Sequence, residues 1–165
     1  MENPKIEYFN IGFNGFISSI QIDNKVYLVN NTNEIYCYNL KLMQMKIITK
    51  GETKFCCIDK RNGNELIIMD TEGNVYLFYI EQHQLKRMNL KIEHCNSIAF
   101  VKNRLYAFPM KNGRGYYLID FEKMSVEFKK IQYGLANEEL NKVAFSQTFC
   151  YNDKVFVNIC SNLDL

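Results

Sequence analysis

Six cysteines and two histidines are the residues of this chain whose types could hold a metal ion or supply a nucleophile. The cysteines include no Cys-x-x-Cys pair, although structural zinc sites are built from closely spaced Cys or His pairs. In a reducing compartment, free cysteines behave as small buried hydrophobic residues, and we expect that role here. The positions concerned are Cys37, Cys56, Cys57, Cys95, Cys150, Cys160, His83 and His94.

A nucleophile activated by a histidine base would have to use one of these two histidines. His83 lies in the polar stretch Glu81-Gln-His-Gln84, which we interpret as a solvated outer turn. His94 directly precedes Cys95, and adjacent residues of an extended chain point to opposite sides, so the two form a poor dyad. The sequence therefore predicts no catalytic residue and no enzyme.

Phosphate and nucleic-acid chemistry are also poorly supported. Gly113-Arg-Gly115 is the only Gly-x-Gly sequence, and it falls in a predicted hairpin turn rather than at the start of a helix. Aromatic residues make up 14% of the chain. Their strand-like spacing among Val, Ile and Leu is typical of a core rather than of a base-stacking platform. We expect no cofactor, no metal ion and no nucleic-acid partner.

Composition places the chain among ordinary globular proteins. It has 165 residues, 47% hydrophobic and 23% charged, which is enough for one domain with a real core. The net charge of +2 is spread without a run of five like charges, which argues against a nucleic-acid tail or a polybasic membrane patch. The first ten residues lack the apolar region of a signal peptide, and no apolar run approaches the length of a spanning helix. We expect a cytoplasmic protein without a membrane partner.

The elements that would position any site follow a repeat of about 40 residues. Tyr36, Tyr76 and Tyr117 occupy equivalent places in three Tyr-bearing segments, with separations of 40 and 41 residues. Each segment follows a turn and a short apolar strand. A period of 40 to 50 residues built from strands indicates propeller blades.

Each period resolves into four predicted strands separated by Asn- and Gly-containing turns. The inner strands are nearly continuous apolar runs, as expected when both faces of a sheet are covered. The outer strands alternate and carry lysines, which protect an exposed sheet edge. The sequence predicts an all-β fold, a β-propeller of four-stranded antiparallel blades with about 3.5–4 blades present, in one domain over residues 1–165. The repeat units are approximately residues 15–51, 52–92, 93–131 and 143–165, with an insertion over residues 132–142.

The two ends of the repeat are irregular. Residues 6–11 are predicted to form a lone strand, and residues 155–160 provide the last strand of half a fourth unit. Leu135, Leu140 and Val143 have helical spacing, so the insertion is predicted to carry a helical turn. Two explanations stay open: the chain is part of a larger propeller, which we favour, or the leading strand completes the last blade of a small closed ring.

The repeat resembles a degenerate blade of the kelch type, or of the wider propeller superfamily. The resemblance rests on the tyrosines of the second and third strands and on segments such as Tyr38-Asn-Leu40 and Ile119-Asp-Phe121, which are similar to the end of a propeller third strand. It covers about residues 15 to 160. The chain lacks the Gly-Gly pair of kelch repeats and has no Trp, so the resemblance implies architecture and no functional residue.

A propeller presents its loops at the ends of a rigid scaffold, which favours a binding function. We expect a non-catalytic protein–protein interaction module with a protein partner. The turns between second and third strands should share one face. The predicted partner-binding residues on that face are Asn31, Asn33, Glu72, Lys111, Asn112 and Arg114.

Two other hypotheses remain open. The chain could be a truncated part of a larger propeller enzyme or scaffold whose active or binding residues lie outside it. It could also self-associate through open strand edges at residues 6–11 and 155–160.

Overall fold

A computed structural model describes residues 15–110, 114–132 and 143–161 of the chain. Within these ranges the chain forms fourteen β-strands and no helix. The first blade consists of β1 (Phe16–Ile22), β2 (Lys25–Asn30), β3 (Glu34–Asn39) and β4 (Gln44–Lys50). The second consists of β5 (Phe55–Lys60), β6 (Glu65–Asp70), β7 (Asn74–Tyr79) and β8 (Gln84–Lys91). The third consists of β9 (Cys95–Val101), β10 (Arg104–Pro109), β11 (Gly115–Asp120) and β12 (Ser125–Lys130). A two-stranded sheet of β13 (Val143–Tyr151) and β14 (Lys154–Ser161) follows.

Each blade is an antiparallel meander in which strands pair in sequence order. Equivalent turns of the blades share an unusual backbone conformation. Met43, His83 and Met124, each at the last turn position before a fourth strand, have φ values of 54°, 51° and 50°. This left-handed conformation is uncommon for residues with a side chain. Its recurrence shows that the three blades share one backbone plan despite their different sequences.

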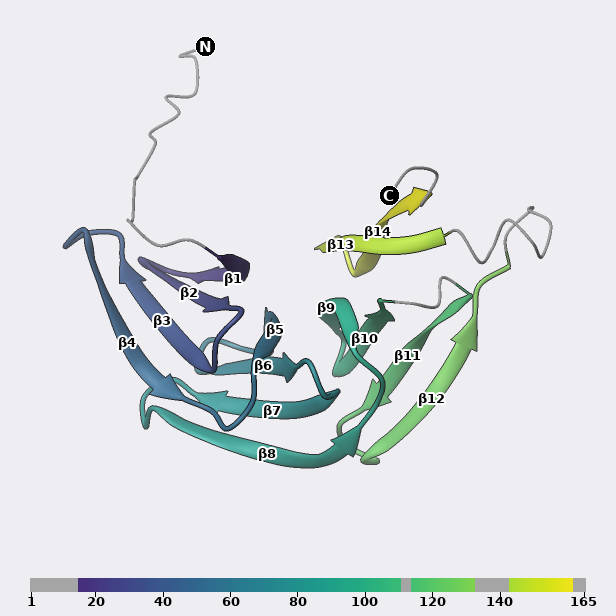
Figure 1. Cartoon of the computed structure of the whole chain (residues 1–165), viewed down its shortest axis with the longest axis horizontal. Coiled ribbons are helices and arrows are strands. Elements are labelled where there is room, and N and C mark those ends of the chain that lie inside the picture. Colours follow the sequence, from purple (N-terminus) through teal and green to yellow (C-terminus); the bar gives the residue numbers. More distant parts are fainter. Residues whose placement is uncertain (1–14, 111–113, 133–142, 162–165) are drawn as a thin grey trace, which may run out of the picture.

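Figure 1 shows the blades arranged in an arc, with β1, β5, β9 and β13 on the inner side and β4, β8 and β12 on the outer side. The innermost strands of consecutive units contact one another, β1 with β5, β5 with β9 and β9 with β13. One hydrophobic cluster fills the junction between the first and second blades, and it includes Ile35, Phe55 and Phe78, which are fully buried. A second cluster fills the junction between the second and third blades. Most of the apolar burial that stabilises the fold is therefore between blades.

Polar side chains on the innermost strands reinforce each junction. The Ser18 hydroxyl accepts a hydrogen bond from the Ile58 amide at 3.2 Å. The Asp59 carboxylate accepts one from the Phe100 amide at 2.6 Å. The Thr148 hydroxyl donates to the carbonyl of Ile98 at 2.7 Å. Each bond links neighbouring units, so hydrogen bonds as well as apolar packing fix how the blades meet.

The predicted all-β propeller architecture is confirmed, including three complete blades and half of a fourth unit. The strands of the three complete blades and β14 begin and end within two residues of the bounds that the sequence predicts, whereas no bounds were predicted for β13. The helical interpretation of Val143 is wrong, because this residue begins the nine-residue strand β13. The predicted strand at residues 6–11 and the predicted helical turn at residues 133–142 lie outside the described residues.

Candidate functional site

Three of the six predicted partner-binding residues, Asn31, Asn33 and Glu72, line one open depression between the first and second blades. The depression lies on the face that carries the turns between second and third strands, and its volume is about 720 Å³. Its complete lining is Asn31, Thr32, Asn33, Glu52, Thr53, Lys54, Thr71 and Glu72. The structure therefore brings together residues from two turns and one connection that are up to 41 positions apart.

The other predicted residues are placed differently. Lys111 and Asn112 lie outside the described residues. Arg114 directly precedes β11 in the third blade, where its carbonyl accepts a hydrogen bond from the Ile131 amide at 2.9 Å. It is not among the residues that line the depression.

Sequence reasoning missed the contribution of Glu52, Thr53 and Lys54, which belong to the connection from β4 to β5. The signal was available in the predicted topology. In a four-stranded antiparallel meander, the chain leaves the fourth strand on the same face as the turn between the second and third strands. The connection between blades therefore had to share the predicted face.

Backbone hydrogen bonds hold this connection against the turn of the first blade. The Phe55 amide donates to the Thr32 carbonyl at 3.0 Å, and the Gly51 amide donates to the Asn33 carbonyl at 2.7 Å. The side-chain amide of Asn33 donates in turn to the Gly51 carbonyl at 2.7 Å. Both ends of the connection are therefore held by hydrogen bonds, and the buried ring of Phe55 also anchors its second end in the first hydrophobic cluster.

A fully buried carboxylate, Asp70, lies at the end of β6 beside the depression. One of its oxygens accepts hydrogen bonds from the amides of Glu72 and Asn74, at 2.9 and 2.8 Å. The other accepts from the Asn74 side chain at 2.7 Å, from the Tyr76 hydroxyl at 2.9 Å and from the Thr53 hydroxyl. Five donors thus converge on one side chain, and two of them come from residues of the lining.

These donors decide the ionisation of Asp70. Burial by itself would raise the pKa of this carboxyl, but hydrogen bonds from Thr53, Asn74 and Tyr76 outweigh burial and lower the pKa below its ordinary value. The group is therefore a carboxylate at neutral pH. A charged acceptor with all its donors in place holds the turn over residues 70–74 in one conformation, which positions Glu72 at the rim.

The other blades have different residues at the position of Asp70. Asn30, which pairs with Phe16 as Asp70 pairs with Phe55, accepts hydrogen bonds from the amide and hydroxyl of Thr32. In the third blade Pro109 takes this position and has no side-chain acceptor. Capping of this turn by the side chain at the position of Asp70 is therefore found in the first two blades, whose turns form the depression.

A second hollow of about 680 Å³ lies on the inner side of the arc and is lined mainly by the innermost strands. Its polar lining includes Ser18, Asp59, Asn96 and Ser97. Burial raises the pKa of Asp59 above its ordinary value, although hydrogen bonds from the Phe100 and Lys60 amides act in the opposite direction. Within the described ranges, the buried hydroxyl of Ser97 has no hydrogen-bond partner.

The cysteines are placed as small core residues in four of six cases: Cys37, Cys56, Cys57 and Cys95 are buried, whereas Cys150 and Cys160 are exposed. A hydrogen bond to Cys56 and burial raise the pKa of Cys57, and burial raises the pKa of Cys95. These thiols are protonated at neutral pH and are therefore poor nucleophiles.

The histidines lie where the sequence predicted. His83 is exposed in the β7–β8 turn, and His94 lies in the connection before β9. Over the described residues, no group of three His, Cys, Asp or Glu side chains is arranged to hold a metal ion. Over the same residues, no helix is long and apolar enough to cross a membrane.

Comparison with protein-family models and with curated protein sequences finds no match. Solved structures do match. The chain is similar to an auxiliary nutrient binding protein from Bacteroides thetaiotaomicron, with 16% identity and a TM-score of 0.69, over 90% of this chain and 36% of that chain. It is similar to the WD40 repeats of RRP9, with 10% identity and a TM-score of 0.57, over 81% of this chain and 41% of that chain.

A shorter protein matches over nearly its whole length. The computationally designed Ika4 protein shares 11% identity and a TM-score of 0.62, over 92% of this chain and 94% of that chain. At these identities the likeness extends to the fold alone, and it agrees with the propeller architecture. The chain spans less than half the length of the nutrient binding protein and of the RRP9 repeats.

Proposed function

We propose that this chain is a non-catalytic protein–protein interaction module of kelch-like propeller type, and that it acts in the cytoplasm. The depression between the first and second blades is its partner-binding surface. The observation that carries the proposal is the convergence of Asn31, Asn33 and Glu72 on this one surface. Propeller-like neighbours support a fold that presents binding loops.

The chemistry of the lining suits an extended polypeptide. The lining carries two carboxylates, Glu52 and Glu72, one ammonium group, that of Lys54, and several hydroxyl and amide side chains. Such a surface offers hydrogen bonds to a peptide backbone and an excess of negative charge. We therefore expect the partner to present a polar segment with a lysine or arginine.

The proposal is tested by comparing substitutions on the two faces of the scaffold. The binding-face variant carries Asn31→Ala and Glu72→Ala, which remove exposed side chains without touching the Asp70 carboxylate. The control variant carries Lys41→Ala and Glu81→Ala in exposed turns on the opposite face. Affinity capture with quantitative mass spectrometry should show a protein that is retained by the wild type and the control and is lost with the binding-face variant.

A binding-face variant that captures the same proteins in the same amounts would remove this surface from consideration. Thermal unfolding of all three proteins tests whether the substitutions damage the fold. If the unfolding midpoints are equal, loss of a partner reflects the loss of contacts with it and not a loss of stability. A partner released equally by both variants would likewise speak against the depression.

A second candidate function rests on length. Since the chain spans 36% and 41% of two larger propeller-like structures, it can also be read as part of a larger propeller enzyme or scaffold. Its functional groups would then converge with those of further blades at the inner hollow. Immunoblotting of the endogenous protein against the 19.5 kDa chain separates the two readings, because a much larger polypeptide would favour the second.

A further inference from the structure

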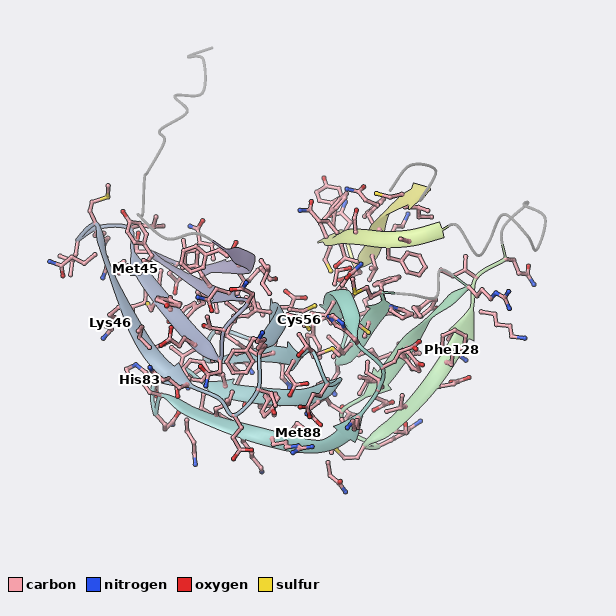
Figure 2. The ribbon with its side chains drawn as sticks, viewed as in Figure 1. Met45, Lys46, Cys56, His83, Met88 and Phe128 are labelled. Carbon is pink, nitrogen blue, oxygen red and sulfur yellow. The ribbon has the colours of Figure 1, made fainter. Side chains whose placement is uncertain are left out.

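A cavity of about 310 Å³ lies between the first and second blades, at the end of the junction opposite the partner-binding depression. Figure 2 shows three of its residues, Met45 and Lys46 on β4 and His83 on the β7–β8 turn of the neighbouring blade. Its volume is within the range of small-molecule pockets. The lining is Lys25, Tyr27, Cys37, Asn39, Leu42, Gln44, Met45, Lys46, Ile48, Ile80 and His83.

The floor of the cavity is a regular array of side chains on one face of the first blade. Tyr27 pairs with Cys37, and Cys37 pairs with Lys46, so these three lie in one row across β2, β3 and β4. The next row contains Lys25 and Asn39, with Gln44 beside them. Because alternate residues of a strand share a face, both rows point toward the second blade.

Positive charge gathers around this floor. Burial raises the pKa of the Cys37 thiol, while the charges of Lys25 and Lys46 act in the opposite direction, which places both ammonium groups near the same sulfur. Among the described residues, neither lysine belongs to an ion pair and no acidic residue lines the cavity. Burial and Cys37 raise the pKa of the Tyr27 hydroxyl to about 12, and the charge of Asp23 adds a smaller increase.

Asn39 adds an oriented donor to this charge. Its side-chain oxygen accepts hydrogen bonds from the amides of Lys41 and Leu42, at 2.9 and 3.0 Å. With the oxygen fixed in the turn, the amide nitrogen is left to donate. Hydrogen-bond donors and cations therefore surround one end of the cavity, and Ile48 and Ile80, which pack against the first hydrophobic cluster, form an apolar wall.

The repeat shows why this junction has a cavity. At the equivalent positions of the next junction, Leu77 replaces Cys37 and Phe121 replaces Ile80, and both are buried in the second hydrophobic cluster. The larger side chains occupy the volume that the smaller pair leaves open. The charge differs as well, since Glu65 replaces Lys25 and forms an ion pair with Arg61 at 3.2 Å.

We propose that this cavity binds a small amphipathic anion, a carboxylate with a short apolar chain, with Lys25, Lys46 and the Asn39 amide at the carboxylate and the wall of Ile48 and Ile80 at the chain. Two ammonium groups next to an apolar wall match both parts of such a ligand. The site lies on a different surface from the partner-binding depression, so the two proposals stand independently.

Octanoate is the probe, and amide chemical shifts in an NMR titration of the full chain are the measurement. Octanoate should shift the amide signals of Lys25, Asn39 and Lys46, and octanol should bind at least about tenfold more weakly because it lacks the charge. Lys46→Met should weaken octanoate about three- to fivefold, as expected for an exposed charge pair. Lys86→Met is the matched control, because Lys86 is the equivalent residue of the second blade, and it should change nothing.

The double variant Cys37→Leu/Ile80→Phe gives the first junction the residues of the second and should abolish binding by filling the cavity. If this variant fails to fold, the pair of lysine variants still decides. The proposal is overturned if octanoate shifts none of these signals, if octanol binds as tightly, if Lys46→Met and Lys86→Met behave alike, or if a folded filled variant still binds.

Discussion

Replacement of Asp70 should destabilise the protein more than replacement of any exposed aspartate. In Asp70→Asn, one carboxylate oxygen becomes an amide nitrogen that faces the donating amide of Asn74, at a separation now bridged by a 2.7 Å hydrogen bond. The hydroxyls of Tyr76 and Thr53 can turn to become acceptors, but this amide cannot. One charge-assisted hydrogen bond is therefore lost, which is worth about 1.5–3 kcal/mol.

Asp70→Ala is more severe because it removes the acceptor of all five donors. Water from the adjoining depression can satisfy some of them, so we expect a loss of about 3–5 kcal/mol rather than the sum of five bonds. The total unfolding free energy of a domain is about 5–15 kcal/mol. With a urea m-value of about 2 kcal/mol/M, the alanine variant should therefore lower the unfolding midpoint by about 1.5–2.5 M.

Urea unfolding followed by circular dichroism measures this effect, and Asp120→Asn is the control. Among the described residues, Asp120 accepts the amides of Glu122 and Lys123 through one oxygen, which an asparagine can reproduce. Its midpoint should change much less than that of Asp70→Ala, because only weak charge interactions with Lys123 and Arg104 are lost. An Asp70→Ala protein within about 1 kcal/mol of the wild type would refute the view that this buried carboxylate holds the turn.

The same residue should give the stability an acid dependence. The pKa of Asp70 is lower in the folded state than in the unfolded state, where it is about 3.9. Its contribution is therefore complete above that value and is lost as the pH falls through the folded pKa. The unfolding free energy of Asp70→Asn should change less with pH in this acid range than that of the wild type.

Three further outcomes are expected. Gly73→Ala should lower the unfolding free energy by about 2–4 kcal/mol, because Gly73 has a φ of 81° and a Cβ atom there would lie 1.8 Å from the Ile92 carbonyl oxygen. The control is Gly63→Ala, which adds a methyl group in open space and should be tolerated. Equal urea midpoints for the two variants would contradict this reasoning. Ser18→Ala removes the hydroxyl that accepts the Ile58 amide between the first two blades and should lower the same free energy by about 1 kcal/mol, whereas an unchanged value would mean that water replaces the hydroxyl. A thiol reagent should label two cysteines of the native protein, Cys150 and Cys160, and all six after unfolding; rapid labelling of a third would show that the core opens easily.

Much of the fold could be predicted because the repeat units of the chain can be aligned with one another. Apolar inner strands, lysine-bearing outer strands and turns rich in Asn and Gly recur at about 40 residues, so each blade supports the interpretation of the next. Strand β13 was harder to identify, since the spacing of Leu135, Leu140 and Val143 is equally compatible with a helix. The predicted insertion over residues 132–142 interrupts the repeat just before β13, so the period could not be used to place the start of this strand.

The candidate sites could be predicted only in part. Asn31, Asn33 and Glu72 were assigned to one face from topology, which places turns but not the volumes between them. The cavity beside Lys46 depends on the size of Cys37 relative to Leu77, a difference that matters only once strand register aligns the two residues. Sequence patterns show which residues share a face, whereas cavities require the packing distance between faces.

The residue that begins the second strand is charged in all three blades, but only in the first blade does it lack an oppositely charged neighbour among the described residues. Lys25, Glu65 and Arg104 begin the second strands of the three blades, and their register partners are Asn39, Tyr79 and Asp120. Two of the three charges have an oppositely charged neighbour in their own blade. Glu65 pairs with Arg61. Backbone hydrogen bonds from Lys123 and Glu122 are the main cause that lowers the pKa of Asp120, and the charge of Arg104 lowers it slightly further.

Lys25 differs, because the residue opposite it is a neutral amide whose oxygen is already used by the turn. If this lysine served only the fold, an acidic residue at position 39 would stabilise it as Asp120 does for Arg104. Asn39→Asp reproduces that arrangement, and its carboxylate can accept the same two turn amides. We therefore expect Asn39→Asp to leave the protein as stable as the wild type or more stable, and at the same time to weaken octanoate binding by placing a negative charge at the carboxylate end of the cavity. If stability falls together with octanoate binding, Asn39 is required by the fold. The Asn39 amide would then no longer support the proposal that the cavity binds a ligand.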